Sequence, residues 1–247
     1  MIIIDKNFEG NISQSLQDSV NTPTILLIDK EKNWTSFDVI AKLRGMLKIR
    51  KIGHAGTLDP LATGLLILGV GKGTKLLTEL TGNDKTYTGT IKFGATTQTD
   101  DAEMEEENKV SDEKLNSIDL SYLNNLKDNF TGIIEQYPPR FSAKKIKGIK
   151  MYDMARKGQE FEIKPVNVEV KSFELSNFNL PFCDFKISCS KGTYIRSIAR
   201  DLGNAAKVGG YLSDLRRTCI EDFNVNNAFT LSELNEILIN SNKQDLD

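Results

Sequence analysis

Cysteine is scarce in this sequence, with only three among 247 residues. Cys183, Cys189 and Cys219 are odd in number, and no two of them form a Cys-x-x-Cys pair. This pattern argues against a disulfide framework and against a tetrahedral zinc site. We therefore expect a reducing compartment, the cytoplasm, as the location of the protein.

The sequence also lacks long apolar runs and an excess of positive charge. No run approaches the roughly 18 residues that a membrane helix needs, and Met1–Ile4 is too short for the core of a signal peptide. Neither secretion nor membrane spanning is supported. Because 32 basic and 34 acidic residues give a net charge of −2, any attraction to nucleic acid has to come from local patches.

The chain does contain enough apolar residues, 39 per cent, to bury a core, and its length fits one large domain or two small ones. Short apolar or alternating runs predict strands at 24–30, 65–70, 87–93 and 185–189. Helices are predicted after a cap at Thr35 or Ser36, from 195 to a stop at Gly203, and over 231–239. Residues 1–21 are interpreted as a variable leader or an added edge strand. This mixture predicts an α+β fold.

One stretch, Gly53–Gly64, places a single carboxylate among glycines, five residues after the only histidine of the chain. Asp59 is followed by Pro60, which stiffens the backbone at this point. Two interpretations are open. Asp59 is either a reactive carboxylate held in a fixed direction, or the cap of a helix that begins at Pro60.

Basic residues are concentrated in two stretches. Between Lys42 and Lys51 there are five basic residues and no acidic one, which form either a solvated helix face or contacts to phosphate. Between Arg140 and Lys157 there are seven basic residues and one acidic residue, with aromatic residues between them. This composition suits RNA, and together with Pro138-Pro139 it predicts a flap at about 137–157. A solvated amphipathic loop is the alternative.

Other charged residues carry a weaker signal. Six acidic residues between Asp100 and Glu107 predict a solvent-exposed loop, with metal binding as the alternative. Arg200 is expected to be solvated, as many helical arginines are.

Three strings that follow one another along the chain, Gly53–Gly64, Lys191–Arg196 and Leu215–Thr218, resemble the motifs of the tRNA pseudouridine-55 synthases, the TruB family. The similarity runs from about Ile25 to about Leu234. It implies the pseudouridine synthase fold: a mixed, mostly antiparallel sheet with flanking helices and a central RNA-binding cleft. Residues 22–247 would form the catalytic domain. Because the chain ends soon after the similarity, we expect no C-terminal PUA-type RNA-binding domain.

The resemblance also implies an activity. TruB enzymes are isomerases that flip a T-loop uridine of tRNA, break its bond from N1 to C1′ and rejoin the uracil through C5. Because nothing is oxidised, this chemistry requires no redox cofactor and no metal. The resemblance implies the tRNA T-arm as partner, and we expect a monomer. By the resemblance Asp59 is the catalytic carboxylate, Arg196 pairs with it and keeps it ionised, and Tyr87 lies against the flipped ring. From the residues alone, the alternative for Tyr87 is core packing.

Further residues are implied to bind the substrate. His54 would fill space near the flipped base, with a purely structural histidine as the alternative, and Tyr194 and Leu215 would line the uracil pocket. Lys30 would lie near the entrance, and Arg140 and Lys144 of the flap would contact tRNA.

The sequence departs from the family pattern in one turn. The usual Lys-Pro-x-Gly is here Lys30-Glu31-Lys32-Asn33, which puts the turn and the role of Lys30 in question. A second functional class also stays open at this point: a tRNA-binding or tRNA-folding module that has lost catalysis. The presence of Asp59, Tyr87 and Arg196 together disfavours it.

Overall fold

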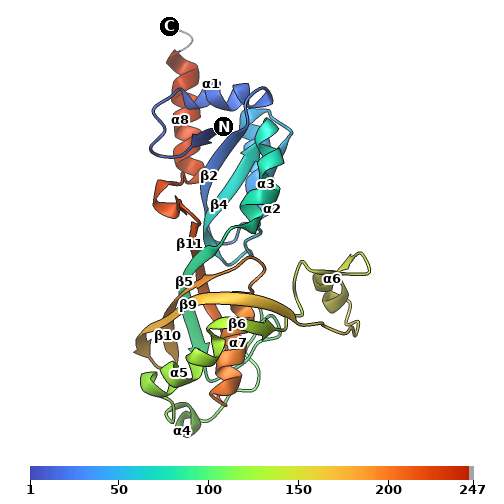
Figure 1. Cartoon of the computed structure of the whole chain (residues 1–247), viewed down its shortest axis with the longest axis vertical. Helices are drawn as coiled ribbons and strands as arrows, with labels where there is room; N and C mark the ends of the chain where they lie inside the picture. Colours follow the sequence, from blue (N-terminus) through green and yellow to red (C-terminus); the bar gives the residue numbers. More distant parts are fainter. Residues whose placement is uncertain (245–247) are drawn as a thin grey trace. The chain divides into compact units, whose positions relative to one another are not determined.

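A computed structural model describes residues 1–244 of the chain. These residues form two compact units, one of Met1–Thr86 with the C-terminal part from Arg216, and one of Tyr87–Leu215. Two strands, β5 (Lys85–Phe93) and β11 (Gly210–Ile220), each contribute residues to both units. Figure 1 labels the helices and strands of both units.

The first unit contains strands and helices from both ends of the chain. They are β1 (Ile2–Ile4), α1 (Ile12–Gln17), η1 (Asp18–Val20), β2 (Thr24–Lys30), α2 (Ser36–Leu47), β3 (Ile52–His54), β4 (Thr63–Val70), η2 (Gly71–Leu76), α3 (Leu77–Gly82), β12 (Phe223–Asn224), η4 (Val225–Asn227) and α8 (Leu231–Gln244). Strand β2 lies between β1 and β4, and the end of β11 follows β4. The opening isoleucines form the edge strand β1, parallel to β2.

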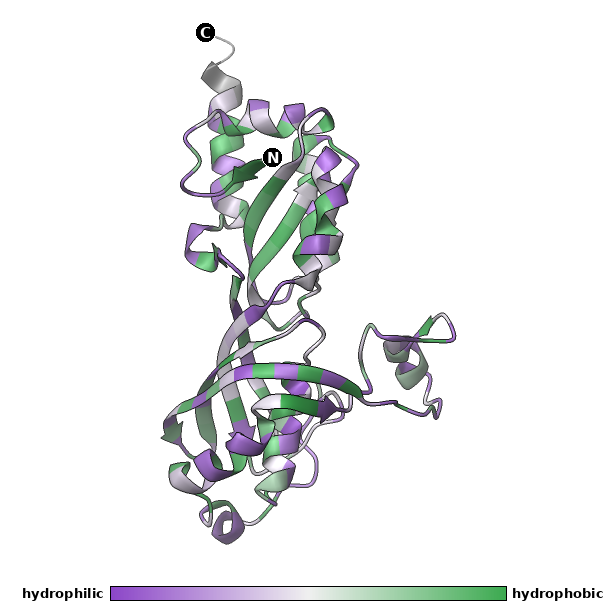
Figure 2. Ribbon diagram, viewed as in Figure 1, coloured by the Kyte–Doolittle hydropathy of each residue, from purple (hydrophilic) through white to green (hydrophobic). Residues whose placement is uncertain are grey.

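The core of the first unit lies on both faces of its sheet. Strands β2 and β4 are antiparallel and apolar over most of their length, as their green colour in Figure 2 shows. Leu26 and Ile28 pack on one face with α2 and α8, whereas Ile25 and Leu27 pack on the other. Alternate side chains of a strand point to opposite faces, so a continuous apolar run fits a strand that is covered on both sides.

Helix α2 begins where the sequence predicts. Thr35 caps it, because its hydroxyl accepts from the Asp38 N–H while the Asp38 carboxylate accepts from the Thr35 N–H, a reciprocal capping box. The helix ends at Leu47, and the next residue, the C-cap Lys48, adopts a left-handed conformation with φ 59°. The predicted strand at 24–30 and this helix are therefore confirmed.

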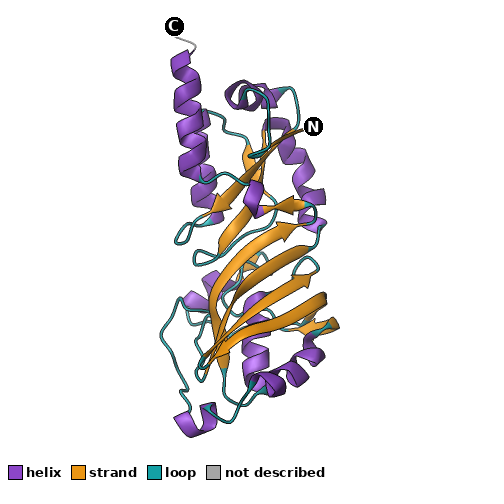
Figure 3. Ribbon diagram, turned by 90° about the vertical axis from the view of Figure 1, so that its left-hand side faces the viewer, coloured by secondary structure: helices purple, strands orange, loops and turns teal. Residues whose placement is uncertain are grey.

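The second unit is a sheet with helices packed against it (Figure 3). Besides β5 and β11 it contains α4 (Asp112–Leu115), α5 (Leu120–Lys127), η3 (Asp128–Phe130), β6 (Gly132–Gln136), β7 (Lys145–Ile146), β8 (Ile149–Lys150), α6 (Met151–Arg156), β9 (Val166–Asn179), β10 (Phe182–Cys189) and α7 (Ile195–Ala205). The strand order is β11-β5-β10-β9-β6, and β9 is antiparallel to both β10 and β6. The predicted α+β class is confirmed.

Helix α7 corrects one prediction about a glycine. The helix does not stop at Gly203 but continues to Ala205. A Cβ at Gly203 would lie 2.3 Å from the Gly210 backbone nitrogen, so the glycine permits close contact between α7 and β11 rather than ending the helix. Ile198 and Leu202 bury the apolar face of the helix, as predicted.

Candidate functional site

The residues that the sequence singles out occur in both units. Lys30, His54 and Asp59 belong to the first unit, whereas Tyr87, Arg140, Lys144, Tyr194, Arg196 and Leu215 belong to the second. The expected pair of Asp59 and Arg196 joins residues of different units and stays a prediction.

The loop that carries Asp59 connects β3 to β4 and contains no helix. Asp59 does not cap a helix, so this alternative is wrong: a turn follows Pro60, and β4 begins at Thr63. Ser36 holds the residue before Asp59, because its hydroxyl accepts from the Leu58 N–H at 2.9 Å and donates to the Leu58 carbonyl at 3.2 Å. Leu58 is buried and Asp59 half-buried. The carboxylate is thus attached to a fixed backbone.

Arg217, to which the sequence assigned no role, holds the other side of this loop. Arg217 as a whole is 1 per cent exposed, and its guanidinium donates to the carbonyls of Leu65 at 2.8 Å, Gly56 at 3.1 Å and Thr57 at 3.5 Å. Gly56 adopts φ 89°, which favours glycine. A buried cation therefore fixes the backbone three residues before Asp59.

Lys30 lies buried rather than exposed, and it binds backbone carbonyls. Its ammonium donates to Trp34 at 2.6 Å, Glu31 at 3.0 Å and Pro60 at 3.3 Å. Burial lowers the pKa of Lys30 to about 8. The negative charge of Asp59 raises this pKa, and the positive charge of Arg217 lowers it further. These bonds support a role in holding the Asp59 loop, and contact of Lys30 with substrate stays a prediction.

The turn after Lys30 accommodates the departure from the family pattern. Asn33 stands where the pattern has glycine, and it adopts φ 68°. Asparagine tolerates this left-handed conformation better than most residues. Its N–H also donates to the Pro60 carbonyl at 2.9 Å, so the turn reaches the residue next to Asp59.

His54 is half-buried at the end of β3. Burial and the positive charge of Arg217 lower the pKa of its imidazole. A neutral ring at neutral pH is compatible with packing beside an uncharged base.

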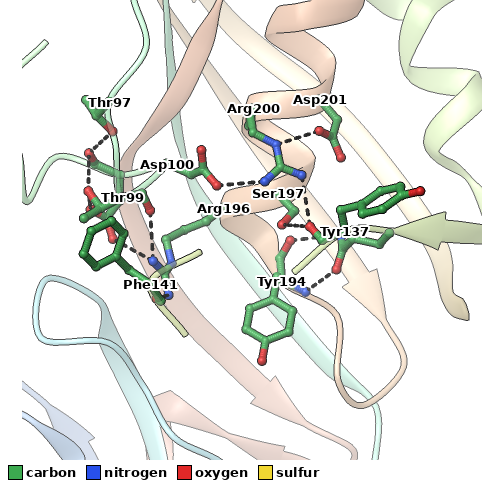
Figure 4. A network of polar contacts seen from close by, with 12 residues as sticks. Thr97, Thr99, Asp100, Tyr137, Phe141, Tyr194, Arg196, Ser197, Arg200 and Asp201 are labelled. Carbon is green, nitrogen blue, oxygen red and sulfur yellow. Dashed lines mark hydrogen bonds and ion pairs between the residues drawn. The ribbon is translucent and has the colours of Figure 1, made fainter. Parts of the chain in front are cut away.

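In the second unit, Arg196 is buried near the start of α7 and binds two loops. Its guanidinium donates to the Thr99 carbonyl at 2.9 Å and to the Phe141 carbonyl at 3.0 Å, as Figure 4 shows. It also lies 3.6 Å from a carboxylate oxygen of Asp101. This carboxylate is fixed in turn, because it accepts from the Thr99 hydroxyl at 2.6 Å and the Glu103 N–H at 3.0 Å.

The acidic stretch 100–107 is therefore only partly the solvent-exposed loop that its composition predicts. Glu103, Glu105 and Glu107 are exposed, but Asp101 is buried and the Asp100 side chain is 12 per cent exposed. The prediction fails for these two residues because their cationic partners lie far away in the sequence, at Arg200 for Asp100 and at Arg196 for Asp101.

Arg200 corrects a second prediction, since it is not simply solvated. Its guanidinium pairs with Asp100 at 2.9 Å and Asp201 at 2.8 Å, and it donates to the Tyr137 carbonyl at 3.0 Å. Burial opposes the charged form, but the two carboxylates raise the pKa of Arg200. No pattern in the sequence indicated that Asp100 pairs with Arg200 or that Asp101 lies beside Arg196.

The predicted base-contacting residues of this unit lie on three elements. Tyr87 is 9 per cent exposed on β5, so its core-packing alternative stays open. Leu215 is equally buried on β11. Tyr194 precedes α7 and is half-buried, and its backbone N–H and carbonyl both bond the Gln136 side chain.

The flap, residues 137–157, contains the small hairpin β7–β8 and helix α6, and it projects beside the sheet in Figure 1. Arg140 donates to the Gln159 carbonyl at 2.9 Å and lies over the Phe161 ring. Lys144 donates to the Lys164 carbonyl at 3.2 Å. Both residues thus contribute to the internal order of this region, while Lys145, Lys147 and Lys150 are exposed.

Nothing in the described part of the chain resembles a metal centre. Residues 1–244 contain no group of three or more histidine, cysteine, aspartate or glutamate side chains that could hold an ion. Cys183, Cys189 and Cys219 are free thiols. Among the helices described, none is both long and apolar enough to cross a bilayer.

Comparisons with known proteins identify the family that the motifs resemble. Residues 44–195 match the family described as "TruB family pseudouridylate synthase (N terminal domain)", and residues 196–247 match "tRNA pseudouridylate synthase B C-terminal domain". A tRNA pseudouridine synthase B of Flavobacterium johnsoniae is 44 per cent identical over 87 per cent of this chain and 95 per cent of the relative. That of Chloroherpeton thalassium is 45 per cent identical over 87 and 90 per cent of the two chains.

Solved structures share the fold. A chain in the crystal structure of a Cbf5-Nop10-Gar1 complex superimposes with a TM-score of 0.67 at 25 per cent identity, covering 95 per cent of this chain. The match spans 62 per cent of that chain, less than two thirds of its length. A chain in a structure of an H/ACA RNP bound to a substrate RNA containing 2′-deoxyuridine gives 0.66 at 22 per cent identity, with coverage of 95 and 61 per cent.

Proposed function

This chain belongs to the TruB family of pseudouridylate synthases, and on that premise we propose that it isomerises the uridine at position 55 in the T loop of tRNA to pseudouridine. Its curated relatives are named tRNA pseudouridine synthase B. The observation that carries the proposal is the Asp59 loop, whose backbone is fixed by Ser36, Arg217 and Lys30 around a half-buried carboxylate.

The reaction needs a carboxylate and no change in oxidation state. The bond from N1 to C1′ breaks, a bond from C5 to C1′ forms, C5 loses a proton and N1 gains one, so the product is an isomer of the substrate. Asp59 either attacks the nucleotide or removes a proton from it. In both cases its direction has to be fixed, because a misplacement of about 1 Å can cost roughly 100-fold in rate.

Arg196 is proposed to keep Asp59 ionised, as the family resemblance implies. The bonds of Arg196 to two carbonyls and its contact with Asp101 support this role, because they restrict the direction of the guanidinium. A lysine has no planar fork of donors and would bind these groups poorly.

The other predicted residues are proposed to bind the flipped uridine and the T-arm. Tyr87, Tyr194 and Leu215 would contact the uracil, and His54, neutral at physiological pH, would occupy the space left by the base. Stacking on an aromatic ring returns about 1 to 3 kcal/mol per base, which offsets the few kcal/mol that flipping costs. Lys30 would act through the loop it holds.

The flap is proposed to bind the tRNA backbone. Its exposed lysines, Lys145, Lys147 and Lys150, suit phosphate contacts. Arg140 and Lys144 keep the flap folded through their backbone bonds, and their own contact with tRNA is part of the proposal. We also propose a cytoplasmic location, where tRNA is modified, and a monomeric enzyme, which light scattering of the purified protein would test.

The decisive experiment is a tritium-release assay with unmodified tRNA labelled at C5 of its uridines, followed by mapping of pseudouridine in the T loop. We expect product at position 55 from the unaltered protein and none from Asp59→Asn. Asp222→Asn is the matched control, since it makes the same change at an exposed position and should retain full activity. Bound tRNA without any product from the unaltered protein would favour a binding module instead.

A further inference from the structure

Two arginines on one face of α7 bind the same two segments of the second unit. Arg196 donates to the Thr99 carbonyl and to the Phe141 carbonyl. Arg200, one helical turn later, pairs with Asp100 and donates to the Tyr137 carbonyl. Each arginine thus joins the loop 97–101 to residues 136–141, which we call the flap root (Figure 4).

The flap root depends on side chains from this end of α7. Strand β6 ends at Gln136, and the next residues include Pro138 and Pro139, which have no N–H to donate. The Tyr137 carbonyl accepts from the Ser197 hydroxyl at 2.8 Å and from Arg200 at 3.0 Å. Gln136 is buried and bonds the backbone of Tyr194, just before the helix. The direction in which the flap leaves the sheet is therefore set by α7.

Arg200 also neutralises the negative charge of Asp100, which interacts with Arg196 as well. Asp100 is largely buried, adopts φ 60°, and interacts with both Arg200 and Arg196. Without Arg200, the nearest cation for Asp100 would be Arg196. A shift of Arg196 towards Asp100 would weaken its bonds to Thr99 and Phe141, because one guanidinium cannot keep all of these partners in good geometry.

We propose that Arg200 is a positioning residue, which holds the flap root through Tyr137 and neutralises Asp100 so that Arg196 keeps its place. This inference rests on the proposed function, in which the flap binds tRNA and Arg196 supports Asp59. It assigns two separable effects to one side chain: the bond to Tyr137 acts on tRNA binding, and the pair with Asp100 acts on the rate.

The two effects are separated by comparing Arg200→Gln with the double variant Asp100→Asn, Arg200→Gln under steady-state and single-turnover conditions. In Arg200→Gln we expect KM for tRNA to rise about tenfold, as for the loss of one charge-assisted hydrogen bond, and the saturating single-turnover rate to fall. In the double variant no unpaired Asp100 charge remains to attract Arg196. The rate should therefore recover while KM stays high.

Lys186→Gln is the matched control, because it also removes one positive charge from the second unit, at an exposed position on β10. Its KM should change less than twofold. Ser197→Ala removes the other donor to Tyr137 without a change in charge and should raise KM alone. This variant keeps the effect of the flap root on tRNA binding testable if Arg200→Gln folds poorly.

Limited digestion with trypsin tests the root independently of tRNA. The flap contains several lysines, and a loosened root should expose them, so Arg200→Gln should be cleaved in the flap faster than Lys186→Gln. If the unaltered protein makes no pseudouridine, the proposed function fails. The digestion then still tests whether Arg200 holds the flap root. An Arg200→Gln protein with wild-type KM, rate and flap cleavage would overturn the inference, as would a lower melting temperature with unchanged kinetics per folded molecule.

Discussion

Replacement of Arg217 tests how the Asp59 loop is held. Arg217→Met keeps most of the buried volume but removes the donors to the carbonyls of Leu65, Gly56 and Thr57. A hydrogen bond to a charged group contributes about 1.5 to 3 kcal/mol, and the bonds to Leu65 and Gly56 are the two shorter ones. Part of their loss is offset, because the variant no longer has to bury a charged guanidinium. We therefore expect the free energy of unfolding to fall by about 2 to 4 kcal/mol.

The same change should slow the reaction. Two of the residues that Arg217 holds, Gly56 and Thr57, lie three and two positions before Asp59. Their release should let the carboxylate move by about 1 Å and reduce the single-turnover rate by roughly 100-fold. Urea unfolding gives the stability, and tritium release at saturating tRNA gives the rate per folded molecule. Arg217→Lys should recover little, because one ammonium cannot reach carbonyls on both sides of the loop.

Arg216→Met provides a control at the adjacent residue. Arg216 pairs with Asp29 through two bonds of 2.7 and 2.9 Å, but its side chain is 38 per cent exposed. We expect a loss of about 1 kcal/mol or less and a rate within about twofold of wild type. If Arg217→Met loses stability but keeps its rate per folded molecule, the guanidinium does not orient Asp59 and the reasoning is refuted.

Three further predictions follow from the charged residues. Burial lowers the pKa of Lys30 from 10.5 to about 8. Between these two pH values Lys30 is deprotonated in the folded protein but protonated in the unfolded chain, so the free energy of unfolding should rise with pH from about 8 to 10.5. Urea titrations should show that Lys30→Met removes this rise, and an unchanged slope would contradict the assignment. Alanine at Lys145, Lys147 and Lys150 should weaken tRNA binding and lower the salt slope by about one per lysine, whereas an unchanged slope would place the phosphate contacts elsewhere. Arg196→Lys should suppress the single-turnover rate more than tRNA binding, and a wild-type rate would remove Arg196 from the mechanism.

Local patterns predicted much of the fold because the physical cause of each element is local. The apolar run at 24–30 is a strand, and the helix after Thr35 begins with the capping box that its sequence allows. Gly203 shows the limit of such patterns. A glycine near the end of a helix indicates either a cap or a close contact, and the contact with Gly210 depends on a strand whose position the local sequence does not specify.

The site was predictable where its residues belong to recognisable strings, and not where a partner is distant. Asp59 and Arg196 were singled out by their strings, and their roles remain predictions. Asp101 and Arg200 were assigned to solvent, because an acidic stretch and a helical arginine are usually solvated. Their burial follows from ion pairs formed between distant parts of the sequence. Arg217 lies in the string Leu215–Thr218, but nothing in that string indicated its role, since its partners are backbone oxygens of other segments.

The buried and half-buried cations of this protein have a consequence for its evolution. Lys30 and Arg217 bind main-chain oxygens, and Arg196 and Arg200 do so in part. Every amino acid supplies such an oxygen, so mutations can alter the side chains of the residues that accept these hydrogen bonds without removing the bonds. Lineages can therefore diversify the surface that meets the nucleic acid while the same few cations preserve the path of the chain.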